Sequence, residues 1–312
     1  MNFSNDTIIQ NATRVTLIPP APSELLAWII AELLTAGIGI VANAILLLAI
    51  ITYAPLRQSS SSILIGHCIL IDIYTCAIAA SIAGSPTYLD PDHIYQQTQT
   101  FCRFRPLWAY LVYPAEAWAT MLLALHRLVA SLSPTLFGRL KTRRVISLFL
   151  ALPWCASLSI VAWQVRPTAK YRMIPSANGG CDYQIGDPQA AFLSTLFGTY
   201  LPTAVAGTCY LIFIFKTLWD SRSPTIGQSV RVKRRLEISR TLMLSFVWHC
   251  VALYPVVIVV TMFSRPFAAM PKLRLGLRWL LDSLCALNPV GNTQRNHLNT
   301  NNDKHSKFHR TD

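Results

Sequence analysis

The sequence predicts an all-α fold in which seven transmembrane helices form one bundle, with the N-terminus outside and the C-terminus inside. The first observation is composition, because 53% of the 312 residues are hydrophobic and 13% are charged, about half the charged fraction of a soluble domain. The second is a series of apolar segments that are each long enough to span a bilayer. These segments are residues 25–52, 62–84, 106–132, 145–165, 189–216, 241–263 and 275–291.

The third observation is the distribution of positive charge. With an outside N-terminus, 17 of the 27 Lys and Arg residues fall in segments assigned to the inside, as the positive-inside rule requires. The net charge of +13 would also suit a nucleic-acid-binding protein. The basic residues lie between apolar segments rather than on one face, so the lipid bilayer is the expected partner and nucleic acid is not.

The chain divides into three predicted regions. Residues 1–22 are polar, and they contain Asn-X-Ser/Thr sequons that predict a glycosylated extracellular segment. The sequons stand at Asn2, Asn5 and Asn11. This region has no apolar core of the signal-peptide type, so the first span is expected to direct insertion. Residues 23–293 form the predicted seven-helix domain, and residues 294–312 form a short cytoplasmic tail.

The third apolar segment is the predicted centre of the bundle. The stretch from Cys102 to Pro134 is predicted to be one long helix. The distance from Cys102 to Arg127 along it is about 37 Å at ~1.5 Å per residue, slightly more than the ~30 Å hydrocarbon layer. Glu116 and Arg127 lie on one helical face. A carboxyl group facing lipid would be costly, so this face is predicted to point into the bundle.

The eight cysteines divide by compartment. Cys102 and Cys181 lie in outer segments, where an oxidising environment permits disulfides, and we expect them to be joined. Cys181 belongs to the long outer segment 166–188, whose Pro and Gly residues predict irregular structure. The other cysteines fall within spans and are expected to act as small apolar residues. They are Cys68, Cys76, Cys155, Cys209, Cys250 and Cys285.

Polar residues and prolines within the spans form an ordered series. The series is Asn43, Asp72, the His126-Arg127-Leu128 triplet, Trp154, Pro202 with Tyr210, Tyr254-Pro255 and Asn288-Pro289. Together with Cys102, it resembles the rhodopsin-like family of G-protein-coupled receptors over residues 25–293. The resemblance implies a plasma-membrane receptor that binds an extracellular small molecule or short peptide and activates a heterotrimeric G protein.

The resemblance places a ligand cavity between the outer ends of the helices. Its expected lining includes Glu32, Ala109, Tyr113 and Asp282. The two acids lie within apolar segments and would suit a cationic ligand group. Basic residues nevertheless crowd the last outer loop, where they would contact lipid headgroups or attract an acidic ligand. These rim residues are Arg265, Lys272, Arg274 and Arg278. The charge of the ligand therefore stays open.

Two ligand classes of the family are poor matches. Members that bind retinal need a lysine in the seventh helix for a Schiff base, and the stretch from Leu275 to Gly291 contains none. Amine receptors carry an aspartate on the third helix at the position of Ala109. We therefore expect neither an opsin nor a receptor for a biogenic amine.

The resemblance also implies a polar core in the middle of the bundle. Its members would be Asn43, Asp72, Glu116 and Asn288. Two adjacent carboxylates in a low dielectric do not both stay charged unaided. Either one carboxyl holds a proton, or a sodium ion lies between Asp72 and Glu116, which would be the only cofactor. The alternative is that Glu116 turns towards the fourth or fifth helix and stays neutral.

Arg127 is expected to contact the G protein once the sixth helix moves outwards. The resemblance adds Tyr210 and three hinge prolines to this switching machinery. The prolines are Pro202, Pro255 and Pro289.

Several residues depart from the family pattern near this switch. His126 replaces an acid beside Arg127, Leu253 replaces an aromatic residue, and Asn292 replaces the last tyrosine of an Asn-Pro-X-X-Tyr motif. Arg235 stands where a glutamate normally holds the arginine, and Glu237 is displaced by two positions. Such changes favour a divergent branch, for example an invertebrate orphan or chemosensory receptor.

Two alternatives from other classes stay open. A transporter or channel would use Asp72, Glu116 and Asp282 as an ion path, although no internal repeat relates two halves of the chain. A non-signalling decoy receptor would explain the altered motifs. No nucleophile elbow, P-loop or metal-ligand cluster is present in the sequence, so an enzyme is not expected.

Overall fold

The computed structural model describes residues 21–54, 59–80, 99–166, 168–169, 171–175, 181–185, 187–221, 229–263 and 270–287. Several predicted features lie outside these residues: Asn2, Asn5, Asn11, Asn288, Pro289 and the tail 294–312. The side chains of Arg235 and Glu237 also lie outside the description.

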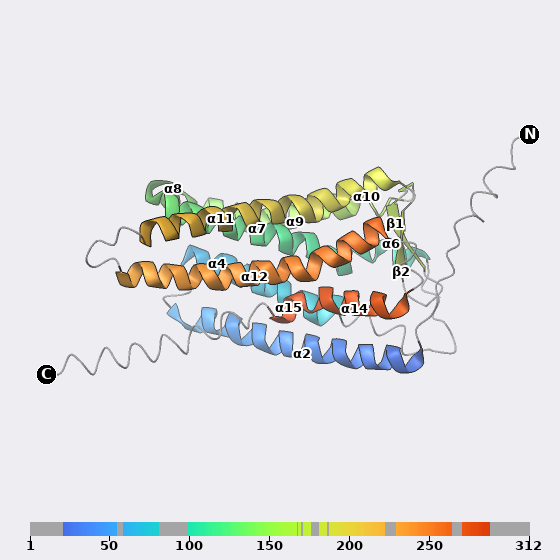
Figure 1. Cartoon of the computed structure of the whole chain (residues 1–312). Coiled ribbons are helices and arrows are strands. Elements are labelled where there is room, and N and C mark those ends of the chain that lie inside the picture. Colours follow the sequence, from blue (N-terminus) through green and yellow to red (C-terminus); the bar gives the residue numbers. More distant parts are fainter. Residues whose placement is uncertain are drawn as a thin grey trace, which may run out of the picture.

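The described helices run side by side as one bundle, and each predicted span corresponds to one rod (Figure 1). The first rods are α2 (Pro22–Thr52), then α4 (Ser60–Tyr74) with η1 (Thr75–Ala80), then α6 (Gln99–Phe104) with η2 (Pro106–Tyr110) and α7 (Val112–Leu132). The short α8 (Pro134–Leu140) and the fourth rod α9 (Arg143–Ala162) follow. The last are α10 (Pro188–Thr195) with η3 (Leu196–Tyr200) and α11 (Leu201–Ser221), then α12 (Ser229–Met262), then α14 (Pro271–Asp282) with α15 (Leu284–Leu287).

The surface of α2 shows how the chain meets lipid. Leu34, Ile38, Val41 and Ile45 recur at spacings of three and four and are each about 60% exposed, so they form one apolar stripe. The opposite face of the helix is buried and carries Glu32, Gly39 and Asn43. The bundle therefore turns its apolar faces outwards and its polar residues inwards, as a hydrocarbon solvent demands.

Within the described part of the chain, four helices are long and apolar enough to cross a bilayer. They are Pro22–Thr52, Ser60–Ile78, Arg143–Ala162 and Pro188–Lys216, and Met243–Val259 is a shorter apolar stretch. The third rod is more polar because it lies inside the bundle, where α7 packs against α4, α9 and α11. Glu116 and Leu123 of the predicted face are both buried on it, which confirms that this face points into the bundle.

The third rod is not one uninterrupted α-helix, so that prediction is wrong in detail. It contains the π-helical segment η2, and the fifth rod contains another, η3. Each segment lies shortly before a proline, Pro114 or Pro202, whose ring would clash with the carbonyl four residues earlier. A wider π-turn relieves that clash, and such turns are common near functional sites.

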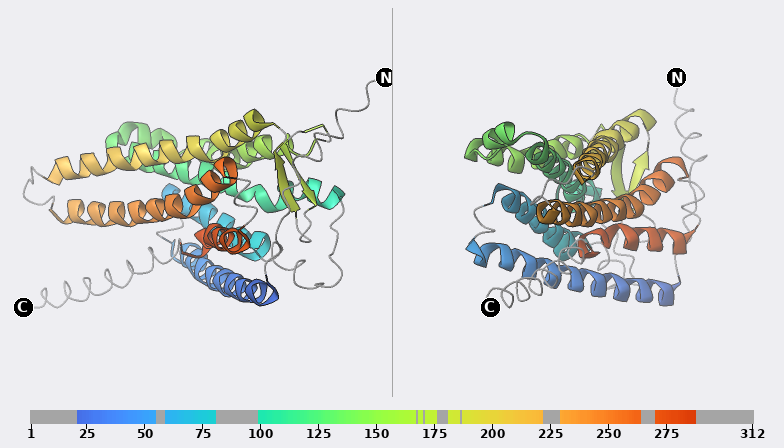
Figure 2. Two further views of the ribbon diagram at one scale, coloured as in Figure 1. Left: turned by 45° about the vertical axis from the view of Figure 1, so that its right-hand side comes forward. Right: turned by 60° about the vertical axis from the view of Figure 1, so that its left-hand side comes forward.

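One end of the bundle carries a β-hairpin, and we call this the hairpin end (Figures 1 and 2). Strand β1 (Tyr171–Pro175) pairs with β2 (Cys181–Ile185) in antiparallel register, with Tyr171 opposite Ile185. This corrects the prediction of irregular structure for residues 166–188. The hairpin is attached to α6 by the Cys102–Cys181 disulfide, which confirms the predicted pairing. Met173 packs beside the two cysteines and is buried.

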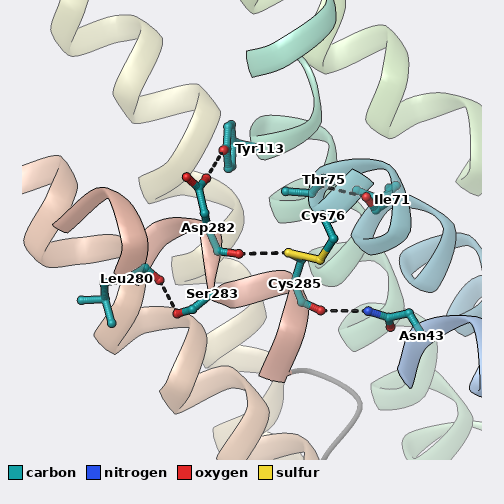
Figure 3. Close-up of a disulfide and its surroundings, with 9 residues drawn as sticks. All are labelled: Asn43, Ile71, Thr75, Cys76, Tyr113, Leu280, Asp282, Ser283 and Cys285. Carbon is teal, nitrogen blue, oxygen red and sulfur yellow. Dashed lines mark hydrogen bonds between the residues drawn. A yellow bond between two sulfur atoms is a disulfide. The ribbon is translucent and has the colours of Figure 1, made fainter. Parts of the chain in front are cut away.

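A second disulfide joins the second and seventh rods inside the bundle (Figure 3). It links Cys76 in η1 to Cys285 in α15, with 6.2 Å between the Cα atoms, and both residues are fully buried. The prediction that these two cysteines are merely small apolar residues is therefore wrong. It considered only cysteines outside the spans, whereas folding brings two span cysteines together. Cys68, Cys155, Cys209 and Cys250 are free, as expected.

The first rod approaches this disulfide at Gly39. A Cβ atom added at Gly39 would lie 2.7 Å from Cys76 Sγ and 2.9 Å from Ala286 Cα. These separations are shorter than van der Waals contact, and one of the neighbours is backbone. Glycine at this position therefore permits α2, η1 and α15 to pack closely.

Gly39→Ala is expected to destabilise the folded bundle by about 1–3 kcal/mol, because the added methyl group overpacks a rigid site. Gly37→Ala is the matched control, since a Cβ at Gly37 on the same helix meets nothing within 4 Å. The measurement is the thermal unfolding midpoint of the purified protein in detergent. Equal midpoints for the two variants would show that the close packing at Gly39 is not a constraint.

Candidate functional site

A cluster of polar and aromatic side chains lies towards the hairpin end, between α2, α7 and α14. We define this polar cluster as Trp28, Glu32, Tyr113, Arg278 and Asp282. Trp28 and Glu32 lie one helical turn apart on α2, and Arg278 and Asp282 lie one turn apart on α14, so each pair shares a face. Glu32 and Asp282 are 3% and 4% exposed, which places two acids almost completely out of solvent.

Asp282 is the centre of the polar cluster. The Tyr113 hydroxyl donates to Asp282 Oδ1 at 2.6 Å, as Figure 3 shows. Arg278 Nε lies 3.9 Å from Asp282 Oδ2. The carboxyl of Glu32 interacts with the carboxyl of Asp282. The structure therefore brings together three of the four residues predicted to line the ligand cavity.

Ala109, the fourth predicted lining residue, is buried in η2. The same turn carries Tyr110, whose ring lies 5.8 Å from that of Tyr113. The guanidinium of Arg105 lies 6.0 Å from the Tyr110 ring centre. Arg105, the residue before η2, is only 2% exposed, so this segment adds aromatic surface and a buried cation beside the polar cluster.

Sequence reasoning missed several of these residues. The Arg278 guanidinium lies 5.7 Å from the centre of the Trp28 ring, and neither residue was predicted to line the cavity. Arg278 lies four residues before Asp282, and Trp28 lies four residues before Glu32. This spacing, which places each pair on one helical face, was the signal in the sequence that could have identified them. No comparable signal identified Arg105 or Tyr110.

The basic rim separates into residues with different surroundings. Arg278 belongs to the polar cluster, whereas Lys272 forms an ion pair with Glu24 at 2.9 Å on the exposed edge. The side chains of Arg265 and Arg274 lie outside the description. The apparent conflict between acids and basic rim is thus partly removed, because Arg278 offsets the charge of Asp282 directly.

The predicted polar core is spread over several contacts. Asn43 Nδ2 donates to the backbone carbonyl of Cys285 at 2.8 Å, and Figure 3 shows this bond beside the disulfide. Asp72 is buried on α4. Glu116 faces the sixth rod, where its Oε1 lies 3.7 Å from His249 Nδ1. Within the described residues, no group of three His, Cys, Asp or Glu side chains that could hold a metal ion is present.

Arg127 and Tyr210 lie towards the end of the bundle opposite the hairpin. Arg127 Nη1 is buried and has no hydrogen-bond partner within the described structure. Tyr210 is buried among α7 residues, and its ring packs 5.4 Å from that of Phe246 on α12. Tyr210 therefore lies where the third, fifth and sixth rods meet.

His126, which replaces the family's acid, is fully buried. Its two ring nitrogens lie 3.4 Å from the hydroxyls of Ser60 and Ser61 at the start of α4. The ring also packs edge-on against Phe137 and Phe149. His126 is thus directed towards α4, α8 and α9.

A polar contact joins the fifth and sixth rods next to their prolines. The hydroxyls of Thr203 and Tyr254 are 2.7 Å apart, and the rings of Tyr200 and Tyr254 are stacked at 5.7 Å. Thr203 follows Pro202, and Tyr254 precedes Pro255. The two expected hinge positions are therefore coupled across the bundle. His67 and Trp154 make a similar link between α4 and α9 at 2.9 Å.

Thr203→Val and Tyr254→Phe are expected to be non-additive in a double-mutant cycle, with a coupling of about 0.5–1.5 kcal/mol. Each change removes one partner of the same hydrogen bond between α11 and α12. The measurement is the unfolding midpoint of both single variants and the double variant. Thr208→Val is the control, because the Thr208 hydroxyl bonds within its own helix to Ala204. Additive effects would contradict the contact.

The comparisons with known proteins agree with this arrangement. A family model described as "7 transmembrane receptor (rhodopsin family)" matches residues 42–290. The match includes all the described rods, although only from the middle of the first one. No curated protein matches the sequence.

Proposed function

The chain belongs to the rhodopsin family of seven-transmembrane receptors, and from this premise we propose that it binds an extracellular small molecule or short peptide and activates a heterotrimeric G protein. As a member of this family it is a multi-pass membrane receptor and not an enzyme. The observation that carries the ligand proposal is the buried polar cluster. Such a group of intramembrane ionisable residues marks a functional site by default.

We propose that the hairpin end faces the outside of the plasma membrane. The Cys102–Cys181 disulfide at this end supports that orientation, because disulfides form in oxidising compartments. The sequons at Asn2, Asn5 and Asn11 support it as well, if they are glycosylated. Arg127 and α8 then face the cytoplasm.

The proposed ligand site consists of Glu32, Ala109, Tyr113 and Asp282, with Trp28 and Arg278 added by the structure. Its side chains come from three helices that are not consecutive in the chain. A ligand that contacts all of them would change how α2, α7 and α14 sit against one another. Such differential binding shifts the population between two helix arrangements.

The proposed coupling site is centred on Arg127 and Tyr210. The prolines Pro202 and Pro255 act as hinges of the fifth and sixth rods, and Pro289 is proposed as that of the seventh. The Thr203–Tyr254 contact supports this part of the proposal, because it links the first two hinges. A movement of one of these rods is then transmitted to the other.

The experiment that tests the proposal is a ligand screen in cells with G-protein dissociation as the readout. Ion flux is recorded in the same cells, since a transporter or channel using Asp72, Glu116 and Asp282 would carry current without G-protein dissociation. A decoy receptor would bind ligand and give neither signal. Ligand-dependent dissociation that is lost in Arg127→Ala supports the proposal.

Ligand-free signalling is expected to be appreciable. His126 replaces the acid that normally holds the arginine, and Arg235 would repel Arg127 from the position of the second acid. The measurement is G-protein dissociation without ligand, compared with Arg127→Ala at equal surface expression. Low basal signalling that rises in Glu237→Gln would instead show that Glu237 holds Arg127.

A sodium ion between Asp72 and Glu116 belongs to the same proposal. Glu116 Oε1 and Asn43 Oδ1 are buried oxygens without a hydrogen-bond partner in the described structure, and hard cations prefer oxygen ligands of this kind. Sodium would neutralise charge in the core and leave the inactive packing more stable.

The purified receptor is expected to unfold at a higher temperature in NaCl than in KCl of equal concentration, and Glu116→Gln is expected to remove that difference. Glutamine keeps the shape of the side chain but carries no charge for the ion. Glu24→Gln serves as the control on the exposed edge. An equal sodium effect in Glu116→Gln would exclude an ion held by this carboxyl.

A further inference from the structure

The polar cluster contains buried polar atoms that the rest of the described protein leaves unsatisfied. Three buried atoms have no hydrogen-bond partner among the described residues: Glu32 Oε2, Asp282 Oδ2 and Trp28 Nε1. Trp28 is 8% exposed, and its ring lies under the Arg278 guanidinium. A buried donor or acceptor that lacks a hydrogen-bond partner destabilises the structure that contains it. Three such atoms in one cluster point to a missing partner.

The two carboxyl groups define what that partner must supply. An ionised carboxyl only accepts hydrogen bonds, so Glu32 and Asp282 can bond to each other only when one of them holds a proton. With both ionised, the two acids carry two negative charges, and Arg278 and Arg105 both act on Asp282. What the pair lacks is a hydrogen-bond donor between its carboxyls, which either one proton or one singly charged cation with N–H groups would supply.

We propose that the Glu32–Asp282 pair binds the protonated nitrogen of an amine ligand, and that this cation replaces the proton that the two carboxyls share. The inference rests on the proposed function, because it names the ligand class of that same site. The exchange balances: the ammonium group enters with one positive charge, and one proton leaves to solvent. The ammonium hydrogens then donate to Glu32 Oε2 and Asp282 Oδ2.

The absence of an aspartate at the position of Ala109 does not oppose this assignment. In the structure the carboxyls come from the first and seventh rods, and Tyr113 on the third rod supplies only a hydroxyl to Asp282. The cation site is therefore displaced from the third helix towards α2. The Trp28 N–H would donate to an electronegative atom elsewhere on the ligand, and the Tyr110 and Tyr113 rings provide aromatic contact.

Among the residues that the structure describes, the other charged groups around the pair do not supply the missing donor. Arg278 Nε is 3.9 Å from Asp282, which is beyond hydrogen-bond distance. Arg105 interacts with Asp282 electrostatically while lying over Tyr110. On the neighbouring helices, His249 of α12 faces Glu116, and Asp72 of α4 is buried. Because Arg278 and Arg105 both lie near Asp282, a second positive charge on the ligand would be repelled.

The test uses direct binding to the purified full-length receptor, so that it does not depend on G-protein coupling. The probes are 2-phenylethylamine, the neutral 2-phenylethanol and the anionic 3-phenylpropanoate, each at millimolar concentration. The readout is the rise in unfolding temperature as a function of probe concentration. We expect stabilisation by the amine, and at least tenfold weaker apparent affinity for the alcohol and the acid.

Proton exchange predicts the pH dependence. The apparent affinity for the amine should rise by up to tenfold per pH unit between pH 6 and 8, because each binding event releases one proton. Glu32→Gln should weaken amine binding at least tenfold and remove this pH dependence. The glutamine amide can donate to Asp282, but it holds no proton that amine binding would release. Glu24→Gln, eight residues earlier on the same helix, should bind as the unmodified protein does.

Several outcomes would overturn the inference. They are equal stabilisation by amine and alcohol, no stabilisation by the amine, or amine affinity that is independent of pH in the unmodified protein. The last measurement needs no variant, so it holds even if Glu32→Gln fails to fold. A different result would contradict the proposed receptor function: the amine binds, but no ligand produces G-protein dissociation.

Discussion

A polar group inside a membrane protein must find its partners within the bundle, because hydrocarbon offers no hydrogen bonds. This constraint accounts for the arrangement of the bundle. Ile38 and Val41 face lipid on α2, whereas Glu32 and Asn43 on the same helix turn inwards. Asn43 bonds to the backbone of α15, and Glu32 approaches Asp282. The first and seventh rods are therefore held together by polar contacts that water would otherwise weaken.

Much of the fold could be predicted because hydropathy and charge are local properties of the chain. The spans, the inward face of Glu116 and the Cys102–Cys181 pairing followed from them. The hairpin did not, since strands of five residues carry a weak pattern and depend on attachment through Cys181. The π-segments before Pro114 and Pro202 were missed because a proline in a span predicts only a local disturbance, whose form is decided by packing.

The candidate site was predictable where one residue was itself unusual. Glu32 and Asp282 stood out as acids within apolar segments, and the structure places them beside Tyr113. Their partners were less visible, because Arg278 at the end of a span has the appearance of an ordinary headgroup contact. The Cys76–Cys285 bond joins residues separated by 209 positions, and only the folded arrangement of the second and seventh rods reveals it.

That bond also changes the covalent topology of the receptor. The chain from Cys76 to Cys285 forms a closed ring, and the smaller ring closed by Cys102 and Cys181 lies entirely within it. A protease that cuts one peptide bond in the larger ring therefore opens the ring without dividing the molecule. The two pieces, one bearing the first rod and one the last, separate only after reduction. The second to seventh rods thus stay one covalent unit after such a cut.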